Sequence, residues 1–195
     1  MAKVRVLDIG SGPGIYVDAL NRHACMAADG VDIEATPSPH NTRMSVFDPN
    51  FAERFAGKYD LVMSFEVGEH LPDQLANAFV ERLTQCLDPA SEVKAIYFSA
   101  AHVGQGGSGH INCQPKQYWI DLFSFHGFQV DEIATQKFID YLRQGYHMGW
   151  LAMNGMVFKP QLQSFADLNF HSIVLEEAPQ AHRVAEYFAQ TFGPH

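Results

Sequence analysis

The strongest constraint on the fold is a glycine-rich turn close to the start of the chain. An apolar run at residues 4–7 predicts a strand, and a helix is expected to begin near Ile15. Between them stands Asp8-Ile9-Gly10-Ser11-Gly12-Pro13-Gly14. A strand that turns through glycines into a helix N-terminus presents backbone N–H groups and the positive end of the helix dipole to a ligand. The turn therefore predicts a ligand site at the end of the first strand.

The spacing of the turn narrows the class of ligand. Ile15 stands where the dinucleotide-binding fingerprint G-x-G-x-x-G has its last glycine, and no Gly-Lys-Ser/Thr follows, which excludes a P-loop. Asp8 suits a ligand that carries positive charge as well as a carboxylate. The turn resembles motif I of the class I S-adenosylmethionine-dependent methyltransferases, whose cofactor has ammonium, sulfonium and carboxylate groups. The resemblance implies that the methionine end of that cofactor is held by Asp8, Gly10, Ser11, Gly12 and Gly14.

Composition fits one globular domain that does not bind nucleic acid. The 195 residues are 47% hydrophobic and 18% charged, and 22 acidic against 13 basic residues give a net charge of −9. Lys and Arg form no cluster, whereas nucleic-acid binders usually carry a basic stripe. No apolar run approaches the roughly 20 residues of a membrane span, and no signal-peptide pattern follows Met1. The odd number and wide spacing of the three cysteines favour reduced thiols in a cytoplasm.

Strand and helix patterns alternate along most of the chain, which predicts a parallel sheet covered on both faces. Strands are expected over residues 4–9, 27–33, 44–47, 61–65, 95–99, 128–133 and 150–158. Helices are expected over residues 15–23, 73–87, 119–126, 138–143 and a stretch after Pro179. The family resemblance implies an α/β fold with a doubly wound, Rossmann-like, seven-stranded sheet whose last strand is antiparallel. Residues 1–160 are expected to form the methyltransferase domain.

The final segment, residues 161–195, is expected to be a helical appendage of the same domain. An apolar stripe on its helix predicts packing against the domain's own sheet, and a homodimer stays open as an alternative; the stripe comprises Ala181, Val184, Ala185, Phe188 and Phe192. A lid over the site is expected from residues 37–43, from residues 134–149 with Tyr146 and His147, or from this appendage.

Two acidic residues at strand ends are candidates for binding the nucleoside part of the cofactor. Asp32 stands about 20 positions beyond the glycine turn, where a carboxylate can accept both hydroxyls of a ribose. The neighbouring Ile33 belongs to the same cofactor-binding set. The resemblance implies that Asp48 accepts a hydrogen bond from the adenine amine, with Phe47 as a packing surface. The alternatives are a surface aspartate at a strand end for Asp32 and an ordinary Asp-Pro turn for Asp48.

The segment Glu66-Val67-Gly68-Glu69-His70-Leu71-Pro72 follows the strand expected at residues 61–65. Ligands of open parallel sheets lie outside the carboxyl ends of the strands, so this segment is expected to border the cofactor and the reacting methyl group. It resembles the E-V-x-E-H-x-P segment of the family. The alternative is a helix N-terminus at which Glu69 favours the dipole and His70 caps locally.

A glycine-rich loop, Gly104-Gln105-Gly106-Gly107-Ser108-Gly109-His110-Ile111-Asn112, follows the strand expected at residues 95–99. With the two segments above it is similar to a set of small uncharacterised methyltransferase-domain proteins of bacteria and their viruses that carry a G-Q-G-G-x-G-H-[IV]-N loop. Such sequences often have Trp where Ala100 stands and His where Ser108 stands, and both departures lie beside the expected acceptor site.

His110 is the first candidate for handling the methyl acceptor, because imidazole titrates near neutral pH and accepts a proton. Such a base is needed when the acceptor arrives protonated. Glu66 and His70 are the second candidates, for orienting the acceptor or its base. The alternative for His110 is that it anchors the loop. No metal site is expected, because the spacing of His102, His110 and Cys113 is loose for zinc.

The sequence thus predicts methyl transfer from S-adenosylmethionine to a small-molecule or glycan-type acceptor. One alternative keeps the fold without the chemistry, as a cofactor-binding module or a partner subunit of another methyltransferase. A second alternative is a methyltransferase that acts on RNA, DNA or protein, which requires a basic groove assembled by folding.

Overall fold

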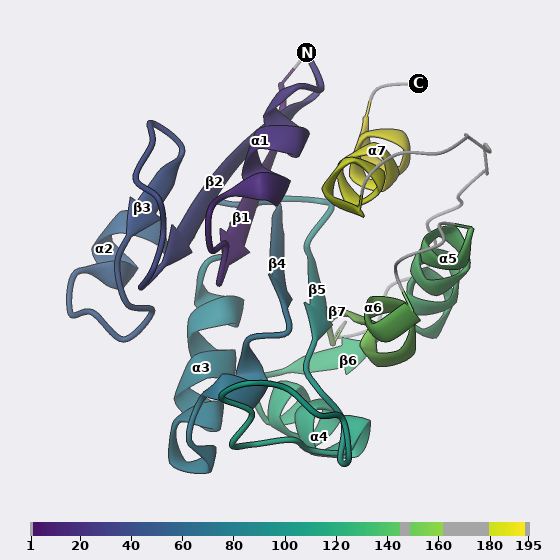
Figure 1. Ribbon diagram of the computed structural model, residues 1–195. Coiled ribbons are helices and arrows are strands. Elements are labelled where there is room, and N and C mark those ends of the chain that lie inside the picture. Colours follow the sequence, from purple (N-terminus) through teal and green to yellow (C-terminus); the bar gives the residue numbers. More distant parts are fainter. Residues whose placement is uncertain (1, 145–148, 162–179, 194–195) are drawn as a thin grey trace.

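A computed structural model describes residues 2–144, 149–161 and 180–193, and its centre is a seven-stranded sheet (Figure 1). The strand order is β3-β2-β1-β4-β5-β7-β6, and β7 runs antiparallel to both of its neighbours while β1 to β5 pair in parallel. The strands are β1 (Val4–Ile9), β2 (Met26–Asp32), β3 (Asn41–Arg43), β4 (Leu61–Phe65), β5 (Ala95–Ser99), β6 (Phe128–Val130) and β7 (Met156–Pro160). The predicted fold class is confirmed.

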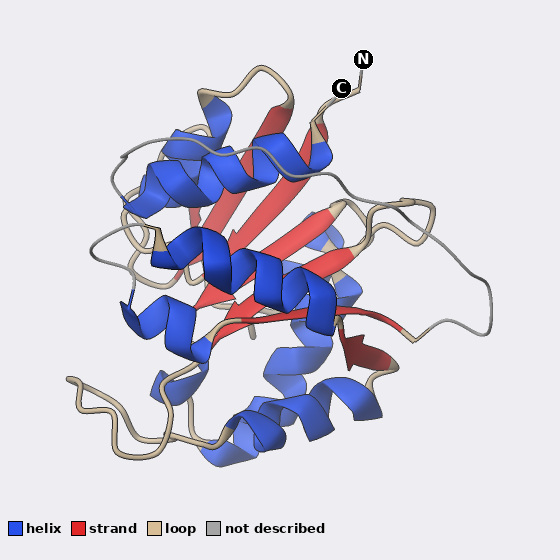
Figure 2. Cartoon of the chain, turned by 90° about the vertical axis from the view of Figure 1, so that its right-hand side faces the viewer, coloured by secondary structure: helices blue, strands red, loops and turns tan. Residues whose placement is uncertain are grey.

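Helices cover both faces of this sheet (Figure 2). The helical elements are α1 (Ile15–Asn21), α2 (Phe51–Phe55), the 3-10 turn η1 (Gly68–His70), α3 (Asp73–Gln85), α4 (Lys116–Phe125), α5 (Glu132–Arg143), α6 (Gly149–Asn154) and α7 (Gln180–Phe192). The core is split by the sheet into two layers, one shared by α1, α5, α6 and α7 and the other by α2, α3 and α4. Burial on both faces explains why β4 is an uninterrupted apolar run apart from Ser64, whose hydroxyl donates to the carbonyl of Ile9.

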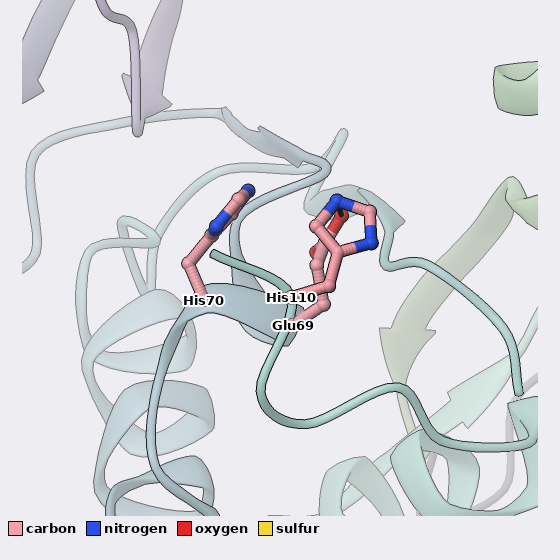
Figure 3. A group of neighbouring side chains, drawn as sticks. All are labelled: Glu69, His70 and His110. Atoms are coloured by element: carbon pink, nitrogen blue, oxygen red, sulfur yellow. Dashed lines mark ion pairs between the residues drawn. The ribbon is translucent and has the colours of Figure 1, made fainter. Parts of the chain in front are cut away.

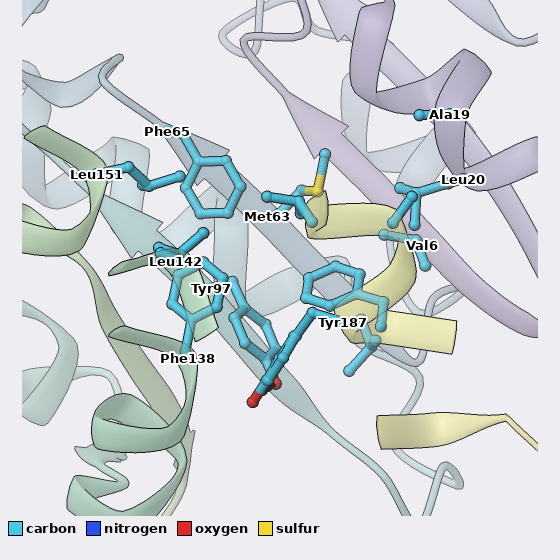
Figure 4. Close-up of a cluster of buried hydrophobic side chains, with 14 of the residues drawn as sticks. Val6, Ala19, Leu20, Met63, Phe65, Tyr97, Phe138, Leu142, Leu151 and Tyr187 are labelled. Atoms are coloured by element: carbon cyan, nitrogen blue, oxygen red, sulfur yellow. Dashed lines mark hydrogen bonds between the residues drawn. The ribbon is translucent and has the colours of Figure 1, made fainter. Parts of the chain in front are cut away.

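The first core layer is centred on Tyr97 of β5 (Figure 4). Its ring lies 5.1 Å from Phe138 of α5 and 4.4 Å from Phe188 of α7, measured between ring centroids. Val184 and Ala185 of α7 are fully buried in the same layer, so three residues of the expected apolar stripe pack inward. The described part of the C-terminal segment therefore belongs to the same core as the sheet.

The second core layer lies on the opposite face of the sheet from the first, and α4 packs there. Phe123 of α4 stacks on Phe158 of β7 with 3.9 Å between ring centroids, and Phe98 of β5 lies 5.0 Å from Trp119. Phe125, with 78% of its surface exposed, does not take part.

The expected third strand at residues 44–47 is wrong, since β3 comprises Asn41–Arg43. Residues 45–48 form a turn instead, in which the Ser45 hydroxyl accepts a hydrogen bond from Phe47 N–H and the Ser45 carbonyl accepts one from Asp48 N–H. Serine side chains compete in this way with strand pairing. The apolar residues around Ser45 give the sequence the pattern of a strand, so the turn is not predicted from it.

The expected last strand at residues 150–158 is also wrong in its first half. Gly149–Asn154 forms α6, and β7 begins only at Met156. A short apolar run does not distinguish a strand from a buried helix, and here Leu151 and Ala152 are buried against α5 and the sheet. Gly155 directly follows the helix; its N–H donates to the carbonyl of Leu151, and a Cβ at this position would lie 2.8 Å from that oxygen.

Three further features bear on the expectations drawn from the sequence. Cys25, Cys86 and Cys113 are all free thiols. No helix in the described ranges has both the length and the apolar character needed to span a membrane. Tyr146 and His147, expected in a lid, and most of residues 161–179 lie outside the described residues.

Replacing Phe138 by Ala tests the first core layer. The ring is fully buried against Phe65, Tyr97 and Tyr187, so its loss is expected to lower the free energy of unfolding by about 3–5 kcal/mol. Phe125→Ala removes the same ring from an exposed position and is expected to cost less than about 0.5 kcal/mol. Urea unfolding of both variants measures the difference, and equal losses would contradict the assignment of the core.

Candidate cofactor site and active site

The glycine turn between β1 and α1 forms an open cradle. Gly10, Gly12 and Gly14 have φ angles of 86°, 51° and 88°, a left-handed region that is cheap for glycine alone. A Cβ on Gly10 would overlap the side chain of Val67, and one on Gly14 would lie 2.9 Å from Asn41 Nδ2. A Cβ on Gly12 would meet no atom within 4 Å. The turn is therefore packed on two sides and open above Gly12.

Asn41 holds the turn in this shape. The side chain is 2% exposed, its Nδ2 donates to the carbonyl of Gly12 at 3.1 Å, and its Oδ1 accepts from the Ser11 hydroxyl at 2.7 Å. The Ser11 hydroxyl is thus engaged by the protein itself. Asn41 is not recognisable as a site residue from the sequence. It stands in a segment expected to be a loop, just before the wrongly placed third strand. A polar residue among polar neighbours gives no signal for a contact 29 residues away.

Asp8, the fifth residue of β1, is a buried acid below the turn. It is 2% exposed, and its Oδ2 atom has no hydrogen-bond partner among the described residues. Burial, assisted by the negative charge of Asp32, raises the pKa of Asp8 to about 8. Burying a carboxyl oxygen without a partner is unfavourable, and a cationic ligand group would offset that cost. The site therefore fits the ammonium group of the cofactor implied by the resemblance.

Asp32 ends β2 beside the same turn. Its Oδ2 accepts a hydrogen bond from Gly12 N–H at 3.0 Å, and its Oδ1 accepts one from Glu34 N–H at 2.6 Å. Each oxygen retains further acceptor capacity, which a ribose diol can use. Ile33 follows with 67% of its surface exposed. The carboxylate and an exposed apolar side chain thus lie next to each other at the strand end.

Asp48 takes part in a local turn, the alternative considered for it. Its Oδ1 accepts from Asn50 N–H at 2.8 Å and from Asn50 Nδ2 at 3.1 Å, and its carbonyl accepts from Phe51 N–H at the start of α2. Phe47 is half-buried against the second core layer. These bonds do not decide the adenine-binding role of either residue, which stays a prediction.

Glu66 has a strained backbone directly after β4. Its φ of 55° is the one positive value at a non-glycine residue in the described ranges. Such strain costs about 1–3 kcal/mol and gathers at functional sites. Two hydrogen bonds from its N–H, to the carbonyl (3.0 Å) and hydroxyl (3.1 Å) of Ser99, hold the conformation.

Two amides fix the Glu66 carboxylate. Gln105 Nε2 donates to Oε2 at 2.8 Å, and Asn154 Nδ2 donates to Oε1 at 3.0 Å and to Gln105 Oε1 at 2.8 Å. Asn154 is 1% exposed. Neither amide was predicted as a partner, because the two residues are 39 and 88 positions from Glu66 and belong to different elements. The resulting triangle joins the loops after β4 and β5 to α6.

Glu69, His70 and His110 lie together beside this triangle, with their side chains on the same side of η1 (Figure 3). Glu69 is fully buried, and neither of its carboxyl oxygens has a hydrogen-bond partner within the described chain. Burial and the nearby Glu66 carboxylate raise the pKa of Glu69 to about 7. His110 Nε2 lies 3.9 Å from Glu69 Oε1, and the two imidazole centroids are 5.0 Å apart.

The backbone fastens the two histidine-bearing segments to each other. The carbonyl of Glu69 accepts hydrogen bonds from Ile111 N–H and Asn112 N–H, both at 2.9 Å. His70 Nδ1 lies 3.1 Å from the carbonyl of Gly109, and His110 Nδ1 lies 3.2 Å from that of Gln105. The anchoring role considered for His110 thus has a contact to support it, while its Nε2 stays directed at Glu69.

The raised pKa of Asp8 predicts how the stability of the folded chain depends on pH. An acid whose pKa is near 8 when folded and near 4 when unfolded stabilises the fold below about pH 4, and that contribution is lost as pH rises toward 8. Asp8→Asn removes this loss. Its melting temperature relative to the wild type is therefore expected to increase between pH 5 and pH 8 by at least about 2 °C, the shift that ~1 kcal/mol produces in a domain of this size. Asp18→Asn, at an exposed position of α1, is the control and should show no such trend.

Comparison with known proteins supports the family resemblance. Residues 2–133 match the family described as "Methyltransferase domain". The chain is 26% identical over 174 residues to the ubiquinone biosynthesis O-methyltransferase of two Pseudomonas aeruginosa strains, covering 82% of this chain and 67% of theirs.

Two solved structures share the fold. A SAM-dependent methyltransferase from Archaeoglobus fulgidus superposes with a TM-score of 0.52 at 17% identity, over 65% of this chain and 62% of that one. PKMT2 from Rickettsia typhi, in complex with AdoHcy, gives 0.53 at 12% identity, over 82% of this chain and 49% of that one. The chain thus spans less than two thirds of each structure. With its strand order and a family match over more than half of its length, the chain belongs to the class I S-adenosylmethionine-dependent methyltransferase domain family.

Proposed function

We propose that this chain transfers the methyl group of S-adenosylmethionine to a small molecule bound over the carboxyl ends of β4 and β5. The observation that carries the proposal is an open glycine cradle above the buried Asp8 carboxyl group, whose Oδ2 atom has no hydrogen-bond partner among the described residues. The open space above Gly12 leaves room for a ligand at the turn, and the buried acid supplies a partner for an ammonium group. The methionine part of the cofactor carries such a group.

The residues around the cradle would hold the cofactor as follows. Asp8 and the turn through Gly10, Gly12 and Gly14 take the methionine part, with Ser11 keeping the turn in shape through Asn41. Asp32 takes the ribose hydroxyls. The adenine would lie near Ile33, Phe47 and Asp48, and Glu66 borders the sulfonium end.

The reaction needs alignment more than activation, because the methyl group is already on a good leaving group. The acceptor's lone pair forms the new bond to carbon while the bond from carbon to sulfur breaks, and S-adenosylhomocysteine leaves with the electron pair. The protein must hold the two reacting atoms about 3–3.5 Å apart in line and exclude water. Glu66, held by Gln105 and Asn154, together with His70 and His110, would orient the acceptor and manage its proton.

Two observations favour a small acceptor over a macromolecule. The net charge is −9 without a Lys/Arg cluster, which disfavours a polyanion such as RNA. The curated relatives are named ubiquinone biosynthesis O-methyltransferases, and a phosphoethanolamine N-methyltransferase from Haemonchus contortus shares the fold with a TM-score of 0.50. A glycan-type acceptor belongs to the same proposal.

Cofactor binding is tested at Asp32. Asp32→Ala leaves the ribose diol without its acceptor and is expected to weaken S-adenosylmethionine binding at least about tenfold, the cost of roughly one unpaired polar group. Titration calorimetry on the purified full chain measures the affinity. Asp121→Ala removes the same charge from an exposed site on α4 and serves as the control. Unchanged affinity in the Asp32 variant would remove this residue from the site.

Catalysis is tested at His110. His110→Ala is expected to lower kcat by about 10²–10⁴, the range of a group that handles the acceptor proton, while the affinity for S-adenosylmethionine stays unchanged. The readout is release of S-adenosylhomocysteine by the purified chain over a panel of phenol, alcohol, amine and glycan acceptors. If the wild type binds the cofactor and turns over no acceptor alone, but does so with a partner protein, the non-catalytic alternative holds instead.

A further inference from the structure

We propose that Glu69, His70 and His110 bind a divalent transition-metal ion, with Zn²⁺ as the best match, at the acceptor side of the site. The spacing of His102, His110 and Cys113 in the sequence predicts no metal site. In the structure His102 Nδ1 faces the carbonyl of Val103 at 2.8 Å, and His110 is grouped with Glu69 and His70 instead.

The three side chains are close enough to share one ion. One ligand atom of each lies within 4.8 Å of the others, and His110 Nε2 is 3.9 Å from Glu69 Oε1. Bonds of about 2.0–2.2 Å place the ligand atoms of one zinc ion roughly 3–4 Å apart. Small side-chain rotations therefore complete the site, and Figure 3 shows the three groups rising together from η1 and the neighbouring loop.

Both imidazoles are held in the tautomer that binds a metal through Nε2. A carbonyl oxygen accepts hydrogen bonds, so Nδ1 of His70 donates to Gly109 and Nδ1 of His110 donates to Gln105. A proton on Nδ1 leaves the lone pair of a neutral ring on Nε2. Metal-binding histidines generally donate their other ring N–H to a carbonyl or a carboxylate in this way, which fixes the orientation of the ring.

Glu69 supplies an independent indication of a cation. Its carboxyl group is fully buried, and both oxygens lack hydrogen-bond partners in the described residues. Buried carboxyl groups are otherwise hydrogen-bonded, paired or bound to metals. His110 Nε2 faces Glu69 Oε1 across 3.9 Å, which is too long for a hydrogen bond, and the Glu66 carboxylate lies near the same group. A metal ion between them would satisfy the carboxylate.

The donor set decides the class of metal. Two imidazoles with one carboxylate suit zinc and its neighbours among the transition metals, whereas Mg²⁺ prefers oxygen ligands and keeps several waters. Three protein ligands leave a coordination position open, as in catalytic zinc sites. His70 is exposed, so that position is reached from solvent.

The open coordination position of the ion indicates the class of substrate, and this step rests on the proposed function. With both imidazoles bound to the ion, a hydroxyl oxygen held there would lose its proton to water and not to His110, and it would do so more readily because the ion stabilises the oxyanion. That oxygen would then form the bond to the methyl carbon as the carbon–sulfur bond breaks. The acceptor would be an alcohol or a phenol, and the product a methyl ether.

Metal binding is tested without cofactor or acceptor. The full chain is stripped with a chelator and titrated with ZnCl₂ by calorimetry and with CoCl₂ by visible absorption. The wild type is expected to bind one ion per chain with the absorption of bound Co²⁺. His70→Ala and Glu69→Gln are expected to weaken binding by at least the roughly 10–100-fold that loss of an outer-shell partner costs. Because His70 is exposed, its variant does not depend on tolerance of a buried change.

His40→Ala is the matched control. His40 Nδ1 lies 3.5 Å from Asp29 Oδ1, a histidine–carboxylate pair at an exposed place that belongs to no three-residue cluster in the described chain. Its affinity for Zn²⁺ should equal that of the wild type. Absence of binding by the wild type, or equal weakening in the control and in His70→Ala, would overturn the metal site.

The catalytic part is tested on chelated enzyme. Turnover of hydroxyl acceptors should be lost on chelation and return with Zn²⁺, while S-adenosylmethionine still binds. Turnover that survives complete metal removal would overturn the role of the ion and leave the proposed function intact. Failure to bind S-adenosylmethionine would overturn the proposed function and leave the metal titration unaffected.

Discussion

The carboxyl edge of this sheet contains two buried acids whose carboxyl oxygens are not all satisfied by the described residues. Asp8 lies below the glycine turn and Glu69 lies under the histidines, each nearly or fully inaccessible and each with a carboxyl oxygen that no described residue satisfies. Burial raises the pKa of both, to about 8 and about 7. Burying such oxygens without a partner costs free energy. Cations supplied from outside the chain would remove the cost.

The rest of the site keeps these two acids in place. Asn41 clamps the glycine turn from β3, and the Glu66 carboxylate is held from two other segments by Gln105 and Asn154. These amide hydrogen bonds restrain the glycine-rich loops. Methyl transfer requires this, because donor and acceptor must be held in a fixed geometry. The strain at Glu66 persists because the surrounding hydrogen bonds over-determine its conformation.

The sequence alone predicted the parts of the fold that depend on local pattern. The bounds of β1, β4 and β5 agree with the expected residues 4–9, 61–65 and 95–99, because each is a mainly apolar run ended by a turn. The strands expected at residues 44–47, 131–133 and 150–154 are wrong, because short apolar runs there follow no clear period, and α5 already begins at Glu132. Asp8, Asp32 and Glu66 lie at or directly beside the carboxyl ends of β1, β2 and β4 as expected, while their roles stay predictions. Asn41, Gln105 and Asn154 were not predicted, since their partners are distant in the sequence and a single polar residue carries no signal of its own.

Proton release on cofactor binding tests the central claim most directly. Titration of the chain with S-adenosylmethionine near pH 7, in buffers of different ionisation enthalpy, measures the number of protons exchanged. Because Asp8 is largely protonated at that pH and would ionise beside the incoming ammonium group, the wild type should release close to one proton and Asp8→Asn none. Binding without proton release in the wild type, or equal release in both proteins, would contradict the assignment of Asp8 to the cofactor.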